Sequence, residues 1–324
     1  MNFDTYAGYP DPVSICNDAV FKAVFTKNTA ESRTALKSLL SAFLERELSV
    51  LDVMANEPPI HDLQDRQIRY DISVRFNDGE LADVEMTVNP KRYESLRFEY
   101  YTARLFVDQN IRGAGRSFRD LKPTYHLSFL YGNLYPDNEW LHRFVYYDFE
   151  RNIKMGGRTE IVTVELKKLG KKKGKAAIKV GELDSRELWG MFMMYYREDK
   201  KTGIIQRIIT MDEGIAAADQ VMHGFTESEL ERYAARARDK FELDAREELW
   251  EMKEDAREEG LAQGLAQGRA QGRAQGLAQG RTEGLAEGRV EGLKDIARKL
   301  KAMGIPLDQI IEASGLSAEA IEQL

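Results

Sequence analysis

The stretch DISVRFNDGELADVEMTV, residues 71–88, contains two strand patterns on either side of the turn sequence NDG. Apolar and polar residues alternate in both halves, so each strand is expected to have one apolar face and one polar face. Asp71 and Glu85 fall among the polar positions. The stretch therefore predicts a β-hairpin that packs on a core through the side chains of Ile72, Val74, Phe76, Val84, Met86 and Val88.

The register of this hairpin decides which side chains are neighbours. Directly opposed residues share a face, so partner numbers must add to an even total if the two apolar faces are to coincide. A two-residue turn of Asp78 and Gly79 gives an odd total and is rejected. A three-residue loop with Gly79 left-handed places Asp71 directly across from Glu85, and the next even register places Asp71 opposite Thr87. Either even register keeps Asp71 and Glu85 on one face.

Two carboxylates on one strand face repel each other unless one is protonated or a cation lies between them. Oxygen ligands of this kind suit Mg²⁺ or Mn²⁺. Acids are also common on the wet face of a sheet, where Arg75 or Lys91 could neutralise them. The spacing alone leaves both interpretations open.

Helical and strand patterns surround the hairpin. Asn17 or Asp18 can cap a first helix, and a second helix is expected within residues 31–49. The order of helix, hairpin, helix and strands predicts an α/β fold. Further strands are expected at residues 124–131, 143–150 and 160–166, and the helix after the hairpin carries an apolar row of Tyr93, Leu96, Tyr100, Ala103 and Val107.

Composition limits the classes of protein to consider. The 324 residues carry a net charge of −7, and the single cysteine, Cys16, excludes an intramolecular disulfide. The four histidines are too scattered to form a zinc motif with it. The first residues lack the pattern of an export signal, and no apolar run is long enough to span a membrane. A cytoplasmic protein without a membrane partner is expected.

The C-terminal part of the chain is repetitive. Glycine occurs at every fourth position from Gly260 to Gly292, nine times in all. Each glycine costs a helix about 1 kcal/mol relative to alanine, so the tail either packs closely on a second helix, as in a homo-oligomer, or acts as a semi-flexible spacer. We expect a domain at residues 1–224, a charged helix at 225–259, the repeat at 260–292 and a small helical element at 293–324.

That last element spells three short helices broken at Gly304 and Gly315, which is typical of a helix-turn-helix. Its third helix holds Glu319, Glu322 and Gln323, whose charge disfavours contact with phosphate. A helical cap or an oligomerisation element competes with DNA reading. A better candidate for phosphate contacts is the basic stripe at residues 167–175, although a solvated loop between two strands explains it equally well; the lysines concerned are Lys167, Lys168, Lys171, Lys172 and Lys173.

The motifs NDAVFKAVF, YDISVRFNDGELADVEMTV, ESLRFEYYTARLF and LKPTYHLSFL, in this order and with the glycine-punctuated tail, resemble the Rpn family of recombination-promoting nucleases and transposases. That family is part of the PD-(D/E)XK nuclease superfamily. The resemblance implies a mixed sheet flanked by helices and a DNA endonuclease that depends on Mg²⁺ or Mn²⁺ and is associated with recombination or transposition. It implies that Asp71 and Glu85, with the carbonyl of Met86, bind the metal and that Asp18 is an outer ligand. Asp18 is also explained as a helix N-cap.

One position departs from the superfamily pattern. Where Lys, or Gln in this family, follows Glu-X, this chain has Thr87, whose short neutral hydroxyl can at best orient a water molecule. Lys91 or Arg97 could reach back to supply the charge. Tyr100 and Tyr101 also match family positions, but helical spacing favours a place in the core. The alternative function is therefore a catalytically impaired DNA-binding or regulatory protein that oligomerises through its tail.

Overall fold

The computed structural model describes residues 9–48, 51–54, 69–77, 79–109, 111, 115–174, 179–198 and 202–324. The chain divides into two compact units, Met1–Asp244 and Ala245–Leu324. Within the described ranges, no helix is both long and apolar enough to cross a membrane.

The first unit is built around a six-stranded sheet with the strand order β1-β2-β3-β4-β8-β5. The central strands β3, β4 and β8 run parallel, and the remaining pairs are antiparallel. This mixed sheet confirms the predicted fold class. The strands are β1 (Leu51–Val53), β2 (Ile72–Phe76), β3 (Glu80–Thr87), β4 (Thr124–Leu130), β5 (Leu141–Phe144) and β8 (Thr159–Glu165).

The hairpin of β2 and β3 has the first of the two even registers. Ile72 pairs with Val84 and Phe76 pairs with Glu80, which leaves a three-residue loop. Gly79 has a φ of +95°, a left-handed conformation that glycine adopts without strain. The register that places Asp71 opposite Thr87 is therefore wrong. Of the loop residues, Asp78 lies outside the described part of the chain.

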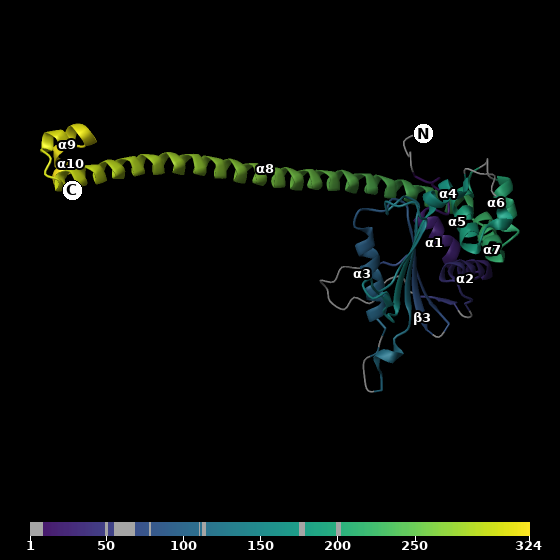
Figure 1. Ribbon diagram of the computed structural model, residues 1–324. Helices are drawn as coiled ribbons and strands as arrows, with labels where there is room; N and C mark the ends of the chain where they lie inside the picture. Colours follow the sequence, from purple (N-terminus) through teal and green to yellow (C-terminus); the bar gives the residue numbers. More distant parts are fainter. Residues whose placement is uncertain are drawn as a thin grey trace. The chain divides into compact units, whose positions relative to one another are not determined.

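The two faces of the sheet have opposite character. The even-numbered apolar residues of β2 and β3 belong to the main hydrophobic core. The helices α1, α2, α5 and α7 lie on this side of the sheet and complete that core (Figure 1). The opposite face carries polar residues of β3 and β4 and is covered by α3. The helices around the sheet are α1 (Asp18–Thr26), α2 (Ala30–Leu44), α3 (Glu94–Val107), α4 (Leu166–Gly174), α5 (Ser185–Tyr195), α6 (Thr202–Ile209) and α7 (Glu213–His223), with short 3-10 helices η2 (Phe118–Asp120) and η3 (Val180–Glu182).

The second helix follows its sequence pattern. Thr29 caps α2 by accepting a hydrogen bond from the backbone N–H of Ser32, and the predicted apolar positions Leu36, Leu39, Leu40 and Phe43 are fully buried. Helices α2 and α7 approach so closely that a Cβ atom added at Gly214 would lie 2.0 Å from Cβ of Ser38. The core on this side of the sheet therefore depends on a small residue in α7.

Helix α3 is turned away from its predicted orientation. The row expected to be buried is exposed instead, with Tyr93 57% and Val107 66% accessible, and Tyr100 is exposed as well. Residues of mixed polarity, Glu94, Phe98, Thr102 and Leu105, face the sheet. The face of the sheet beneath the helix is polar, and its carboxylate pairs with a basic side chain of α3. This face therefore offers no apolar surface to an aliphatic row. The prediction for Tyr93, Leu96, Tyr100, Ala103 and Val107 was wrong.

Two further segments differ from expectation. The strand predicted at residues 143–150 is broken into β5 and β6 (Tyr147–Asp148), and β6 pairs with β7 (Ile153–Lys154) in a separate two-stranded sheet. The solvated loop that was one of two interpretations of residues 167–175 is largely the helix α4, in which Leu166 and Leu169 are fully buried at helical spacing. Leu169 packs on α5, where a Cβ atom added at Gly190 would come within 2.3 Å of it.

Helix α8 (Glu227–Ala302) contains both the predicted charged helix and the whole glycine repeat. An added Cβ atom at any of the repeat glycines from Gly260 to Gly292 would meet nothing within 4 Å. In the second unit, the end of α8 packs with α9 (Leu307–Ser314) and α10 (Ala318–Glu322) around Ala297, Ile310 and Ile321. The breaks fall at Gly304 and Gly315, both with positive φ, as the sequence predicts.

Candidate functional site

The polar face of the sheet brings three ionisable side chains together beneath α3. Asp83 and Glu85 lie two positions apart on β3 and therefore share a face, and His126 is the partner of Asp83 on the parallel strand β4. His126 Nδ1 lies 3.1 Å from Asp83 Oδ2, and His126 Nε2 lies 3.8 Å from Glu85 Oε2. All three side chains are at most 3% exposed. One ligand atom from each lies within 4.8 Å of the others, a spacing that can hold a metal ion.

Asp71 lies in the bend immediately before β2, at the edge of the same group. Its Oδ2 accepts a hydrogen bond from the backbone N–H of Met86 at 3.4 Å. Its charge raises the pKa of both Asp83 and Glu85, so the three carboxylates act on one another electrostatically. The structure thus connects Asp71 to β3 through the N–H of Met86, whereas the residues that come within metal-ligand spacing are Asp83, Glu85 and His126.

Burial is the main cause of the raised pKa of each of these acids. It raises the pKa of Asp83 well above its ordinary value, with Asp71 as the next contribution. Burial and then the charge of Asp83 raise the pKa of Glu85 from 4.5 to about 8. Burial also raises the pKa of Asp71, against the attraction of Lys240. The same effect lowers the pKa of His126 from 6.5 to about 4, so its imidazole is neutral at physiological pH and free to bind a metal.

Of the two cations considered as substitutes for the charge missing at Thr87, one reaches the acids. Arg97 donates to Glu85 Oε2 at 2.6 Å and contacts Glu94 at 2.7 Å. Lys91 instead donates to the backbone oxygen of Asp244. Thr87 lies on the same face as Glu85 and is 8% exposed, so its hydroxyl is close to the cluster but carries no charge.

A lysine that the sequence did not indicate lies on the other side of Asp71. Lys240, from the first part of α8, donates to Asp18 Oδ2 at 2.9 Å. Burial lowers the pKa of Lys240, but the charge and hydrogen bond of Asp18 and the charge of Asp71 more than offset this, so its pKa is raised. Among the charges acting on Asp71, Lys240 is the largest contribution. Asp18 thus lies at the first turn of α1, where it contacts a lysine.

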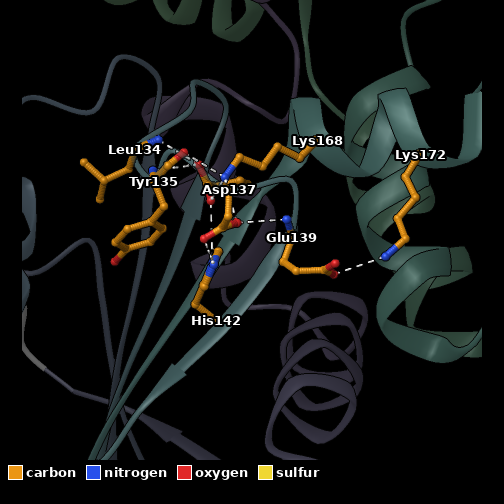
Figure 2. A network of polar contacts seen from close by, with 8 residues as sticks. Leu134, Tyr135, Asp137, Glu139, His142, Lys168 and Lys172 are labelled. Carbon is orange, nitrogen blue, oxygen red and sulfur yellow. Dashed lines mark hydrogen bonds and ion pairs between the residues drawn. The ribbon is translucent and has the colours of Figure 1, made fainter.

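The lysines predicted to bind phosphate lie in different environments (Figure 2). Lys168 is 6% exposed and donates to Glu165 Oε2 at 2.7 Å and to the backbone oxygen of Tyr135 at 2.9 Å. Lys172 is exposed and pairs with Glu139. The Nζ atom of Lys167 lies 4.5 Å from the centre of the Tyr131 ring.

Lys168 is therefore occupied by an internal network, because β8 ends in the buried carboxylate of Glu165, which also accepts from the N–H of Leu134. Lys171 is exposed, and with Lys168 and Lys172 it lines a pocket of about 480 Å³. The side chain of Lys173 lies outside the described part of the structure.

Sequence reasoning missed Asp83, His126 and Lys240. A signal existed for the first two, because Asp83 alternates in phase with Glu85, and His126 alternates with Thr124 and Ser128 in the next strand pattern. The pairing of those two strands could not be read from the chain. Lys240 lies in a uniformly charged helix, where nothing in the sequence sets it apart.

Comparison with known proteins agrees with this geometry. A family model described as PD-(D/E)XK nuclease family transposase matches residues 15–251, which contain every residue of the acidic cluster and Lys240. Searches of the curated proteins and of the solved structures found no match. The matched region covers most of the chain and contains the mixed sheet with its hairpin acids, so the chain belongs to the PD-(D/E)XK nuclease family transposases.

Proposed function

We propose that this chain is a metal-dependent DNA endonuclease of recombination or transposition, with Asp71 and Glu85 as its central acids. The observation that carries the proposal is the pair of buried carboxylates on β3, with Asp71 just before β2, within a chain of this nuclease family. Like charges at this density are unfavourable unless a cation offsets them.

The donor set fits a hard divalent cation. Asp71 and Glu85 would hold the metal through carboxylate oxygens, with the carbonyl of Met86 as a further oxygen donor, and such ligands suit Mg²⁺ or Mn²⁺. When bound, the metal polarises the scissile phosphate and lowers the pKa of a water molecule. Arg97 holds Glu85 in place through its ion pair, and its charge partly offsets the effect of burial on this carboxyl group.

Lys240 takes over the role that Thr87 cannot fill. Its ammonium group is positively charged and donates to Asp18, and its charge also acts on Asp71. A fixed cation at this place stabilises the negative charge that develops on the phosphate during attack. Asp18 is then a positioning residue for Lys240 rather than a metal ligand. Thr87 orients water.

A plasmid-nicking assay tests this assignment. Full-length protein is incubated with supercoiled plasmid and Mg²⁺ or Mn²⁺. We expect the native chain to nick DNA and Asp71→Asn and Glu85→Gln to lose activity at least 100-fold. Lys240→Met loses a similar factor, whereas Arg238→Met, which removes an exposed charge two residues away, keeps it. Cutting by Asp71→Asn at the native rate refutes the assignment.

The second candidate is a catalytically impaired member of the family that binds DNA or regulates another protein. Thr87 is the residue that favours it, because it lacks the amide or ammonium group of the usual position. This candidate requires a native chain that does not cut and a Thr87→Gln variant that does. Unchanged activity in Thr87→Gln beside an inactive Lys240→Met supports the first candidate.

We propose that contacts with DNA include Lys171 and Lys172, which are exposed on α4. Replacing both with glutamine should weaken binding to plasmid DNA without changing the metal affinity, and the salt dependence should become shallower.

We also propose that a second copy of the chain packs on the glycine row of α8, which meets nothing within 4 Å. Sedimentation velocity distinguishes this from a spacer. Alanine at Gly272 and Gly276 should weaken self-association if helices pack there, whereas in a spacer it only raises helix content.

A further inference from the structure

The group Asp83, Glu85 and His126 differs from the pair of acids proposed for catalysis. Two rows of side chains cross the sheet on the face below α3. One row contains Asp83 and His126, and the next contains Glu85, Ser128 and Thr163 on β3, β4 and β8. Every one of these side chains is 2% exposed or less. Polar groups buried inside a protein normally have hydrogen-bond partners, and those without one indicate a bound ion, a water molecule or a functional role.

Several of these polar atoms have no hydrogen-bond partner among the described residues. Both carboxylate oxygens of Asp83 and both ring nitrogens of His126 are in this state, as are the hydroxyl groups of Ser128 and Thr163. The 3.1 Å contact between His126 Nδ1 and Asp83 Oδ2 is close enough for an ion pair but lacks hydrogen-bond geometry. Unsatisfied groups are costly inside a protein, and a bound ion satisfies several of them at once.

Charge and donor type identify the class of ion. Asp83 and Glu85 together supply two negative charges, and His126 adds a neutral nitrogen, which makes three ligands for a divalent cation. An imidazole ligand disfavours Mg²⁺ and Ca²⁺, which prefer oxygen alone, and favours first-row transition metals and zinc. The ring of Phe98 lies against the ring of His126, with centroids 4.9 Å apart, and closes the group on the α3 side.

We infer that Asp83, Glu85 and His126 form a buried binding site for a transition-metal dication such as Zn²⁺, Co²⁺ or Mn²⁺. The site shares Glu85 with the proposed catalytic pair and does not require Asp71. Its ion joins β3 to β4 and stabilises the polar layer on which α3 packs. This inference does not depend on DNA cleavage.

Cobalt titration of the full chain tests the site. Protein treated with EDTA and dialysed is titrated with Co²⁺, whose visible absorption reports nitrogen ligation and low coordination number. We expect one Co²⁺ with such a spectrum, displaced by Zn²⁺ but not by a large excess of Mg²⁺. Binding should also raise the thermal unfolding temperature of the native chain.

Four variants make the test specific. His126→Leu and Asp83→Asn should each lower Co²⁺ affinity at least 100-fold and abolish the spectrum, while Asp71→Asn keeps the spectrum of nitrogen ligation. Ser128→Ala is the matched control, because it changes an equally buried polar residue on the same face that is not a ligand. Near-UV circular dichroism identifies variants that remain folded.

The two ligand variants provide independent tests if one of them fails to fold. The inference is refuted if the native chain binds no Co²⁺, or if a folded His126→Leu or Asp83→Asn variant binds it with unchanged affinity. It is also refuted if Asp71→Asn alone removes the spectrum, because the ion then belongs to the catalytic pair. If the chain binds Co²⁺ with this spectrum but does not cut DNA, the proposed function is refuted and the inferred metal site remains supported.

Discussion

The metal-free protein should become less stable as the pH rises through the range in which Glu85 loses its proton. The folded state raises the pKa of this carboxyl from 4.5 to about 8, so the native chain keeps a proton that the unfolded chain has released. Stability falls with pH wherever the native state binds more protons, so it should decline between about pH 4.5 and pH 8. At about 1.4 kcal/mol per pKa unit, Glu85 alone contributes at most about 5 kcal/mol to this decline.

Replacing Glu85 with glutamine removes this dependence and the like charge beside Asp83. At pH 8 and in the presence of EDTA, Glu85→Gln should therefore be more stable than the native chain by about 2 to 5 kcal/mol, whereas at pH 4.5 the two should agree within about 1 kcal/mol. Urea unfolding at pH 4.5, 6, 7 and 8, followed by fluorescence of the buried Trp140 and Trp189, measures the difference.

Glu99→Gln is the matched control, because it removes an exposed carboxylate from α3 and should leave the pH dependence as it is in the native chain. Parallel stability curves for the native chain and Glu85→Gln between pH 4.5 and pH 8 would refute the reasoning. A native chain that gains stability through this interval would refute it as well. Adding Mn²⁺ at pH 8 should stabilise the native chain far more than the variant, since the metal replaces the proton on the shared carboxylate.

Three further predictions follow from packing and burial. Lys168→Met should lower the free energy of unfolding by about 3 to 5 kcal/mol, because it leaves a buried carboxylate without its cation. Lys172→Met breaks an exposed ion pair and should lower it by less than about 1 kcal/mol in the same urea assay. Gly214→Ala should cost about 1 to 3 kcal/mol, since the new Cβ would lie 2.0 Å from a side-chain carbon of α2, and Gly203→Ala, with open space around it, should be neutral or stabilising. Iodoacetamide at pH 8 should leave Cys16 unlabelled in the native chain and label it in urea, because burial raises the pKa of its thiol to about 12; rapid labelling of the native chain would contradict its placement.

Local patterns were sufficient for the hairpin. The parity argument works because one face of β2 and β3 is buried in an aliphatic core, and a slip of one residue would expose Ile72 and Val84. The first two helices follow their patterns for the same reason. These elements bury apolar faces against apolar partners, which is the situation that sequence periodicity describes.

The same reasoning was wrong for α3, where polar interactions override periodicity, and it did not indicate the buried lysine of α4. Arg97 and Glu94 turn α3 toward the acids and leave Tyr93 and Leu96 in solvent. In α4, Lys168 is buried because it pairs with Glu165 at the end of β8. A buried ion pair depends on both partners, and a pattern of single residues cannot reveal the second one.

The candidate site was predicted in part for a related reason. Asp71 and Glu85 belong to one hairpin, so their proximity follows from local pairing. His126 reaches the cluster through a parallel pairing, which requires a long connection whose course the sequence does not specify. Lys240 arrives from a helix that follows the whole sheet.

The position of Lys240 in the chain has a consequence for the protein during its synthesis. The hairpin acids leave the ribosome early, and the lysine that we assign to charge stabilisation emerges only after every strand of the sheet has been made. On this assignment, a polypeptide released before α8 is translated contains the acids but cannot cut.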